Sequence, residues 1–225
     1  MQQRTPPITG IPAAELEERR ERLLAHVRSV GATGYVLFDQ GYIQYFTSFG
    51  FLSTERPVAF AHSVDGDMVV FVPGFEVERV LAETAFEHVE SYPEYPGLEH
   101  PLTIFARVLA AMGIGGSVAA DGDGYPGILG YQGPALSAVT EARIVPVGDE
   151  IERMMVRKSE TEIALIRESA RWCEHGHRLL QEYSRPGATE AEASWRAGHE
   201  ATLAMLEALG DRYGGQQASA DGVKA

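Results

Sequence analysis

Several short stretches of this sequence carry residue types that proteins use for chemistry. Residues 122–127 (Gly-Asp-Gly-Tyr-Pro-Gly) match the Gly-x-Gly-x-x-Gly string of dinucleotide-binding turns and follow a strand-like stretch. A pyrophosphate would have to approach this backbone, yet Asp121 and Asp123 place carboxylates there and Pro126 removes an amide donor. The same two aspartates could open a calcium loop, but Gln132 stands where a bidentate Glu is required. We therefore interpret the segment as a glycine-rich turn.

The histidines are the other candidates for binding a metal ion. His175 and His177 are two residues apart on an expected helix, so their side chains point to different faces. His199-Glu200 begins a His-Glu-x-x-His string, but Leu203 occupies its last position. We interpret these as surface or interface histidines, and the sequence predicts no metal ligand in this chain.

Nucleophilic catalysis has little support in the sequence. Cys173 is the only cysteine, and it falls on an apolar stripe of an expected helix, so we expect a packed thiol rather than a nucleophile. One cysteine also excludes an internal disulfide. No Gly-x-Ser-x-Gly elbow accompanies the serines, so a serine hydrolase is not indicated.

Composition sets the broad class of the protein. Of its 225 residues, 44% are hydrophobic and 23% are charged, which is typical of a soluble globular protein. The net charge of -13 argues against a surface that neutralises phosphates, so we expect no nucleic-acid partner. No run is long and apolar enough to span a membrane, and residues 1–12 lack the pattern of a signal peptide. These features and the single cysteine lead us to expect a cytoplasmic protein.

The first two thirds of the chain alternate between helix-like and strand-like segments. Two expected strands, 57–63 and 68–72, are joined through Asp65-Gly66, a strong hairpin signal because glycine accepts positive φ. The other expected elements are helices at 15–30, 75–84 and 102–112 and strands at 35–38, 88–92, 117–120 and 142–145, while 41–49 is ambiguous. This order predicts an α/β domain whose sheet is mixed, because the hairpin adds an antiparallel pair.

After residue 158 the sequence indicates only helices. Ser159 with Glu162, and Thr189 with Glu192, are capping boxes, in which the hydroxyl and the carboxylate satisfy each other's helix-start amides. Two helices are expected, over residues 161–183 and 189–209, separated by Pro186-Gly187. The tail, residues 214–225, has little to bury and is expected to fray.

The first of these two helices carries two apolar stripes. One stripe holds Ile163, Ile166, Ala170, Cys173 and Leu180, and the other holds Leu165, Trp172 and Leu179. A helix with two such stripes needs neighbours on two sides. The apolar faces of both late helices lead us to expect that the chain self-associates through them.

Two segments resemble those of a known family. Arg157-Lys158-Ser159, Glu162-Ile163 and Ile166-Arg167 resemble the linker and first helix of the Xaa-Pro dipeptidase and creatinase family, the pita-bread metallopeptidases, with Met155 in place of a usual Arg. Leu37-Phe38-Asp39, Ile43 to Phe49 and Arg56-Pro57 resemble the family's Asn-Ile-x-Tyr-x-Thr-Gly-Phe and Arg-Pro region, with Tyr42 and Ser48 in place of Asn and Gly. The resemblance covers roughly residues 11–209.

The resemblance implies a fold and a division into domains. Residues 1–148 would form a creatinase-type N-terminal α/β domain, ribonuclease H-like with a mixed sheet, and residues 149–225 the linker and first helices of a truncated pita-bread α+β domain. In the family, a later part of the chain holds two divalent metal ions (Mn, Co or Zn), which activate a bridging water. No catalytic residue or metal ligand is assigned here, and this chain alone is not expected to hydrolyse a substrate.

The resemblance also points to residues that contact substrate. In the family, the N-terminal domain of one subunit overhangs the active site of its partner, which implies a homodimer. The candidates here are Tyr45, Phe49, Phe51 and Arg56. Arg56 would bind a substrate carboxylate through a bidentate fork. The alternative is that the aromatic residues belong to the core and that Arg56 pairs with Glu55 or Asp39.

Three functions therefore fit the sequence. The first is the accessory, substrate-orienting and dimerisation part of a protein resembling an Xaa-Pro dipeptidase, which acts on small peptides. The second is a complete non-catalytic binding or interaction protein with the same fold. The third is part of a creatinase-like C–N hydrolase of a small, non-peptide amide. The set of metal ligands would discriminate the peptidase from its relatives.

Overall fold

A computed structural model describes residues 10–94 and 97–210 of the chain. The chain divides into two compact units, one made of residues 12–157 and the other containing residues 158–210. No signal peptide is expected in residues 1–12, of which 1–9 lie outside the described residues. The tail of residues 214–225, which is expected to fray, also lies outside them.

A six-stranded mixed sheet forms the centre of the first unit. Its strands are β1 (Gly34–Leu37), β2 (Ala59–Ser63), β3 (Met68–Pro73), β4 (Val89–Tyr92), β5 (Ser117–Ala120) and β6 (Arg143–Pro146), in the order β4-β3-β2-β1-β5-β6. Strand β2 is antiparallel to β1 and β3, whereas β1 with β5, β3 with β4 and β5 with β6 are parallel pairs. Every strand except β2 thus runs in the same direction, and the carboxyl ends of these five strands meet at one edge.

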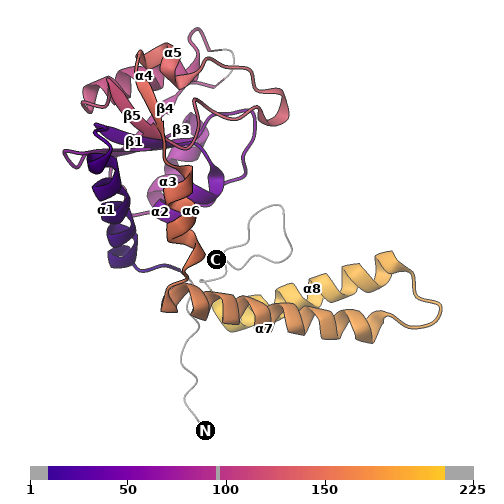
Figure 1. Cartoon of the computed structure of the whole chain (residues 1–225). Helices are drawn as coiled ribbons and strands as arrows, with labels where there is room; N and C mark the ends of the chain where they lie inside the picture. Colours follow the sequence, from indigo (N-terminus) through magenta and orange to yellow (C-terminus); the bar gives the residue numbers. More distant parts are fainter. Residues whose placement is uncertain (1–9, 95–96, 211–225) are drawn as a thin grey trace. The chain divides into compact units, whose positions relative to one another are not determined.

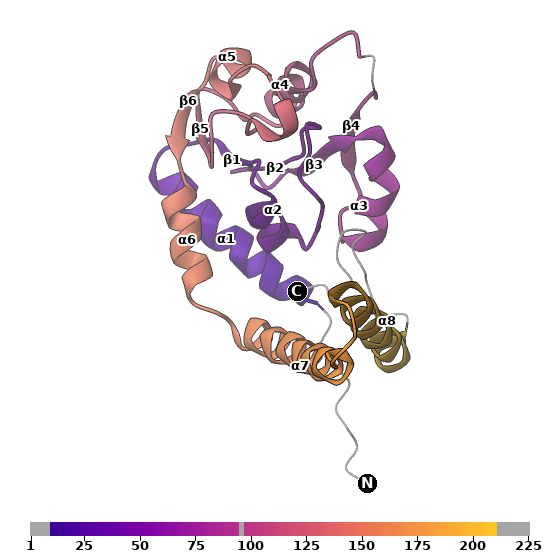
Figure 2. The same ribbon diagram turned by 90° about the vertical axis from the view of Figure 1, so that its right-hand side faces the viewer.

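Helices cover both faces of this sheet (Figures 1 and 2). One face is covered by α1 (Ala13–Ser29), α2 (Gln40–Thr47), α3 (Val77–Glu83) and α6 (Gly148–Val156), and the other by α4 (Pro101–Ala111) and α5 (Leu136–Thr140). Short 3-10 turns lie at Gly74–Glu76 and Ile128–Gly130. The mixed α/β architecture predicted from the sequence is confirmed.

The two cores follow from the alternation of side chains along the strands. In β1, Tyr35 and Leu37 belong to the core under α1 and α2, while Val36 belongs to the core under α4. Both sets are buried, which explains why β1 and β3 are almost entirely apolar in the sequence. On α4, Leu102 and Phe105 are completely buried against the second face.

Local sequence signals were accurate at the turns. The β2–β3 connection contains Gly66 at φ 105°, as the Asp-Gly hairpin signal predicts. Gly31 follows α1 with φ 71°. The ambiguous segment 41–49 is mostly helix: Asp39 caps α2 by accepting the Tyr42 N–H at 3.0 Å, and Ser48 ends it at φ 62°.

Helix α6 was not predicted from the sequence. It begins at Gly148, and Ile151 and Met154 from its inner face are buried in the core shared with α1 and α2. The first compact unit therefore continues to Arg157, beyond residue 148, where the sequence analysis placed the domain boundary. The boundary between the N-terminal domain of the family and its catalytic domain, placed at residues 148 and 149 from the sequence, stays a prediction.

The second unit is a helical hairpin of α7 (Glu160–Tyr183) and α8 (Glu190–Leu209). Both predicted capping boxes are present: Ser159 accepts the Glu162 N–H at 3.0 Å, and Thr189 accepts the Glu192 N–H at 3.2 Å. The Tyr183 hydroxyl, at the end of α7, donates to the carboxylate of Glu200 in the middle of α8. The capping boxes thus fix the two helix starts, and this bond joins the two helices.

The two stripes of α7 differ in burial. Leu165 is buried, and Trp172 and Leu179 are partly buried, whereas Ile166 and Leu180 are exposed. Cys173 is also exposed, so the predicted packed thiol is wrong for this chain. The reason is that Cys173 lies on the stripe of the exposed Ile166 and Leu180, not on the stripe of the buried Leu165.

Candidate substrate-contact site

The segment 48–58, which carries most of the predicted site, lies at the edge where β1, β3, β4 and β5 end. It follows α2 and leads into the antiparallel strand β2, whose amino end is at that same edge. The loops after β3, β4 and β5 also emerge there. In α/β sheets, ligands bind preferentially outside the carboxyl ends of the strands.

Three of the four predicted contact residues are buried. Phe49 is fully buried and Phe51 is 3% exposed, and their rings stack with centroids 5.5 Å apart. Tyr45 is 8% exposed and packs edge-on against Phe46. Their burial agrees with the alternative that these aromatic residues belong to the core. Their contact with a substrate stays a prediction.

Two arginines of α1 hold the end of α2 in place. Arg19 donates to the Tyr45 carbonyl at 3.0 Å, and its guanidinium lies 4.0 Å from the centre of the Tyr45 ring. Arg20 donates to the Phe46 carbonyl at 2.8 Å. Carbonyls in the last turn of a helix lack partners within the helix, so cationic donors there both satisfy them and complement the helix dipole.

Arg79 of α3 holds the next residues of the segment. Its guanidinium donates to the Gly50 carbonyl at 2.6 Å and lies 4.6 Å from the centre of the Phe49 ring. Glu76 orients it by accepting a hydrogen bond from Nε at 2.7 Å. These contacts fix the backbone that leads from α2 to Arg56.

Arg56 is the only one of the four predicted contact residues that reaches the surface. Its guanidinium pairs with Glu55 at 2.9 Å and with Glu94 at 3.3 Å, and it lies 5.7 Å from the centre of the Phe75 ring. The sequence analysis named Glu55 and Asp39 as alternative partners; Glu55 is confirmed, while Asp39 caps α2 instead. Glu94, 38 residues away in the chain, was not anticipated.

Arg56 and Glu94 line a pocket of about 260 Å³ together with Tyr92, Leu98, Glu99 and His100. His100 caps α4 by accepting the Leu102 N–H at 3.1 Å, and burial lowers the pKa of its imidazole. A neutral imidazole keeps its acceptor nitrogen for this cap. The pocket therefore offers one guanidinium, two carboxylates and an apolar wall at the loop edge.

The glycine-rich turn at residues 121–127 acts within the chain. The Asp121 carboxylate accepts the N–H groups of Phe38 and Asp39 at 2.9 and 2.7 Å, which joins the ends of β5 and β1. Asp123 accepts the Ser137 N–H at 2.7 Å, and the Tyr125 hydroxyl donates to the Thr54 carbonyl at 2.9 Å. These contacts show the predicted turn, and the absence of a nucleotide site there stays a prediction.

Asp121 is the described carboxylate most affected by burial. Desolvation raises its pKa to about 6, against the opposite influence of the backbone N–H groups of Asp39 and Phe38. Tyr42, which follows Asp39 in the first turn of α2, donates to Glu152 of α6 at 2.7 Å, and burial raises the pKa of its phenol. Sequence reasoning missed this pair because α6 itself was not predicted.

In the described residues, no group of three or more His, Cys, Asp or Glu is placed to hold a metal ion. His177 and His199 are exposed, and the His199 ring stacks on Trp195 with centroids 5.2 Å apart. Within residues 10–94 and 97–210, no helix is long and apolar enough to cross a bilayer.

Comparisons with known proteins agree with this architecture. The family model for the creatinase/prolidase N-terminal domain matches residues 19–155. A proline dipeptidase from Streptococcus pneumoniae is similar in structure, with a TM-score of 0.51 and 26% identity, over 62% of this chain and 98% of that chain. No curated protein sequence matches the chain.

Two longer structures match more of the chain. An Xaa-Pro dipeptidase from Bacillus anthracis aligns with a TM-score of 0.63 and 17% identity, over 84% of this chain and 49% of that one. The prolidase from Pyrococcus horikoshii aligns with a TM-score of 0.63 and 16% identity, over 83% and 49%. This chain therefore spans about half the length of these two proteins, and at such identities the likeness concerns the fold.

Proposed function

Because the chain belongs to the creatinase/prolidase N-terminal domain family, we propose that it is the accessory, substrate-orienting part of a hydrolase that resembles an Xaa-Pro dipeptidase. The observation that carries the proposal is Arg56, a guanidinium that lines a pocket of about 260 Å³ at the loop edge of the sheet. A planar guanidinium recognises a carboxylate through two parallel hydrogen bonds. The free carboxylate of a small peptide is the ligand group that this site would take.

The chemistry of the proposed hydrolase divides between two parts. Two divalent metal ions, Mn, Co or Zn, would supply the activated water. The described residues do not provide a ligand set for such a pair, so the metals would belong to polypeptide other than residues 10–94 and 97–210. The role left to this chain is to bind and orient the far end of the substrate.

The two carboxylates that pair with Arg56, those of Glu55 and Glu94, determine how a substrate carboxylate would reach its guanidinium. The contact with Glu55 is short, at 2.9 Å, and comes from the adjacent residue, whereas the contact with Glu94 is longer, at 3.3 Å, and comes from the loop after β4. An incoming carboxylate would therefore displace Glu94 first. Glu94 holds the guanidinium in place before binding and competes with the ligand.

A homodimer forms part of the proposal. Large apolar side chains are exposed in four loops at the same edge as Arg56, namely Leu52, Phe75, Leu98 and Leu129. Exposed apolar side chains grouped in this way favour a protein–protein contact. In a dimer, this edge of one copy would face the hydrolytic site of the other and bring Arg56 to the substrate.

The proposal is tested by titrating the chain with the dipeptide Ala-Pro and with its C-terminal amide, which lacks the carboxylate. We expect Ala-Pro to bind about tenfold more tightly than the amide, one charge-assisted contact being worth about 1.5–3 kcal/mol. Arg56→Gln should remove this difference, and Glu94→Gln should strengthen Ala-Pro binding. Arg22→Gln, an exposed arginine on α1, is the matched control.

Equal affinity for the two ligands, or binding that Arg56→Gln leaves unchanged, would contradict the substrate-orienting role. The same samples, supplied with Mn²⁺, Co²⁺ or Zn²⁺, are expected to show no Ala-Pro hydrolysis above the buffer rate.

A further inference from the structure

Two buried tyrosines hold the backbone on either side of Arg56. The Tyr125 hydroxyl donates to the Thr54 carbonyl at 2.9 Å. The Tyr92 hydroxyl donates to the Pro57 carbonyl at 3.1 Å. Both tyrosines are almost completely buried, with Tyr125 6% and Tyr92 5% exposed. Arg56 therefore lies in a stretch, residues 54–57, whose two ends are each fixed by a phenol.

The two tyrosines reach this stretch from opposite sides of β2. The stretch leads into β2, and the strand order is β4-β3-β2-β1-β5-β6. Tyr92 is the last residue of β4, two strands away from β2 on one side, and Tyr125 follows β5, two strands away on the other side. Because β4 and β5 end at the edge where β2 begins, both hydroxyls reach the entry to β2.

The rings of the two tyrosines are linked by phenylalanines in the core under α4. The Tyr92 ring contacts Phe71 with centroids 5.2 Å apart, and Phe71 stacks on Phe105 of α4 at 4.7 Å. Phe105 and Tyr125 each lie 6.3 Å from the Phe38 ring, both edge-on. Buried aromatic rings packed in this way have little room to move, so both hydroxyls are presented from fixed positions.

The glycine-rich turn fixes the backbone that carries Tyr125. Gly124 has φ 118°, and a Cβ there would lie 3.2 Å from the Pro134 carbonyl oxygen, so the turn needs glycine at this close approach. The Asp123 carboxylate accepts the N–H and the hydroxyl of Ser137, in the first turn of α5, at 2.7 and 2.6 Å. The turn is thus tied to α5 on one side and, through Tyr125, to the Arg56 stretch on the other.

We propose that Tyr92 and Tyr125 are positioning residues, which hold Arg56 in the orientation in which its guanidinium receives a substrate carboxylate. This assignment rests on the proposed role of Arg56. The Thr54 hydroxyl accepts the Arg56 N–H at 3.2 Å, so fixing Thr54 also fixes the backbone of Arg56. A guanidinium that is held before binding loses less conformational freedom when the ligand arrives. Burial raises the pKa of the Tyr125 phenol, which keeps its hydroxyl protonated as a donor.

The binding test removes each hydroxyl and keeps each ring. Tyr92→Phe and Tyr125→Phe should each weaken the binding of Ala-Pro by about threefold and leave the binding of its C-terminal amide unchanged, because only the carboxylate uses the guanidinium. The double variant should weaken Ala-Pro binding by about tenfold, so that the preference for the free carboxylate is lost. Tyr42→Phe is the matched control: its hydroxyl donates to Glu152 of α6, and its loss should change neither affinity.

Hydrogen exchange resolved by peptide gives a readout that needs no ligand. The Ser53 N–H donates to Gln40 at 3.0 Å and the Arg56 N–H to the Thr54 hydroxyl, so the amides of this stretch report whether it is held. In the free chain, Tyr125→Phe should speed the exchange of residues 53–56 by about fivefold. The amides of β1 should exchange as in the wild type.

The outcomes separate this proposal from the proposed function. Unchanged exchange of residues 53–56 in Tyr125→Phe would overturn the positioning role, whether or not the wild type distinguishes Ala-Pro from its amide. An equal loss of affinity for the two ligands would also overturn it, because the hydroxyls would then act on the pocket as a whole rather than through Arg56. Faster exchange in a chain that does not prefer Ala-Pro would contradict the substrate-orienting role, and the positioning role with it.

Discussion

The two units differ in how they bury apolar side chains: the α/β unit of residues 12–157 covers most of them, whereas the hairpin of α7 and α8 leaves several large ones exposed. In the first unit, both faces of the sheet are covered, and Phe60, Phe71 and Phe105 are completely buried. In the hairpin, Trp195 is 72% exposed and Ile166 53% exposed. A sheet with helices on both faces completes its own core, whereas two helices can bury only one stripe each.

The difference suggests different roles for the two regions. In the first unit, Arg19, Arg20 and Arg79 hold the segment before Arg56 through contacts with the carbonyls of residues 45, 46 and 50. The hairpin leaves large apolar side chains exposed, and such surfaces favour association. The experiments below measure this contrast, from the largest expected effect to the smallest.

The largest contrast is expected between a core and a hairpin aromatic residue. Phe60 is fully buried and packs edge-on against Tyr35 and Phe86. Phe60→Ala should lower the free energy of unfolding by about 3–5 kcal/mol because it leaves a cavity. Trp195→Ala should change it by less than about 0.5 kcal/mol. Urea unfolding followed by circular dichroism measures both, and equal losses would remove the contrast.

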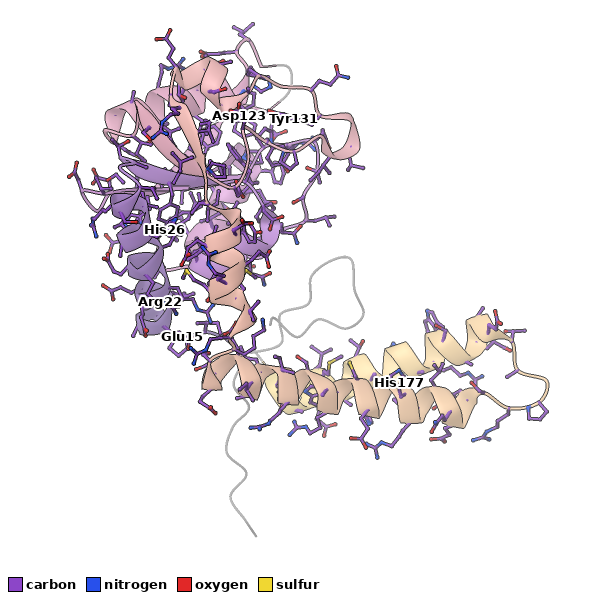
Figure 3. The ribbon with its side chains drawn as sticks, in the orientation of Figure 1. Glu15, Arg22, His26, Asp123, Tyr131 and His177 are labelled. Carbon is purple, nitrogen blue, oxygen red and sulfur yellow. The ribbon has the colours of Figure 1, made fainter. Side chains whose placement is uncertain are left out.

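A second effect concerns the buried arginine at the end of α2. Arg19 is 5% exposed, pairs with Glu15 at 2.5 Å and donates to the Tyr45 carbonyl. Arg19→Met should cost about 2–3 kcal/mol, because a charged donor is lost and a carboxylate and a carbonyl lose a partner. Arg22 is an exposed position on the same helix (Figure 3). Arg22→Met should cost less than about 0.5 kcal/mol in the same urea experiment.

A third effect depends on pH. Burial, with the charges of Arg20 and Arg28, lowers the pKa of His62 to about 4, while its Nδ1 lies 3.2 Å from the Tyr35 hydroxyl. Between pH 6.5 and 4 the unfolded chain therefore binds a proton that the folded chain excludes. The free energy of unfolding should fall by about 2 kcal/mol as the pH drops through this range.

Asp121 acts in the opposite direction over part of the same range. Its folded pKa of about 6 is above the unfolded value, so the folded state binds the extra proton and is favoured as the pH falls. The free energy of unfolding should therefore be measured as a function of pH in the Asp121→Asn variant, in which the dependence caused by His62 is not offset by Asp121. The slope should vanish in Asp121→Asn/His62→Gln; a slope that persists would assign it to another group.

The smallest effect is expected at the start of α7. Ser159→Ala removes the hydroxyl that accepts the Glu162 N–H and should destabilise the hairpin by about 1 kcal/mol. The amides of residues 12–157 should be unaffected, because the two units are separately compact. Hydrogen exchange resolved by peptide measures both regions at once. Increased exchange in β1 or β2 would show that the units unfold together.

Structural features that depend on residues only a few positions apart could be predicted from the sequence. The Asp65-Gly66 hairpin and the two capping boxes have geometry that depends on local backbone chemistry. The position of β5 beside β1, and the contact between Arg56 and Glu94, join segments that are far apart in the chain. The spacing of apolar residues along the chain does not reveal which distant segments lie side by side.

The errors have equally specific causes. Helix α6 is only nine residues long, and its apolar positions, Ile151, Met154 and Met155, give little more than one turn of pattern. For Cys173, an apolar stripe indicates that a helix needs a neighbour but not that the neighbour belongs to the same chain. The burial of Phe49 and Phe51 agrees with the alternative that the aromatic residues belong to the core, while their stacking and the contact of Phe49 with Arg79 are tertiary contacts that no local pattern indicates.

The central claim is that this chain is the orienting part of a larger hydrolytic protein. Its most direct test is the mass of the native protein, measured by immunoblot of its source with an antibody against residues 12–157. The account predicts a band heavier than 24.5 kDa by about another domain. A single band at 24.5 kDa would contradict it and would favour a binding protein that uses this fold without hydrolysis.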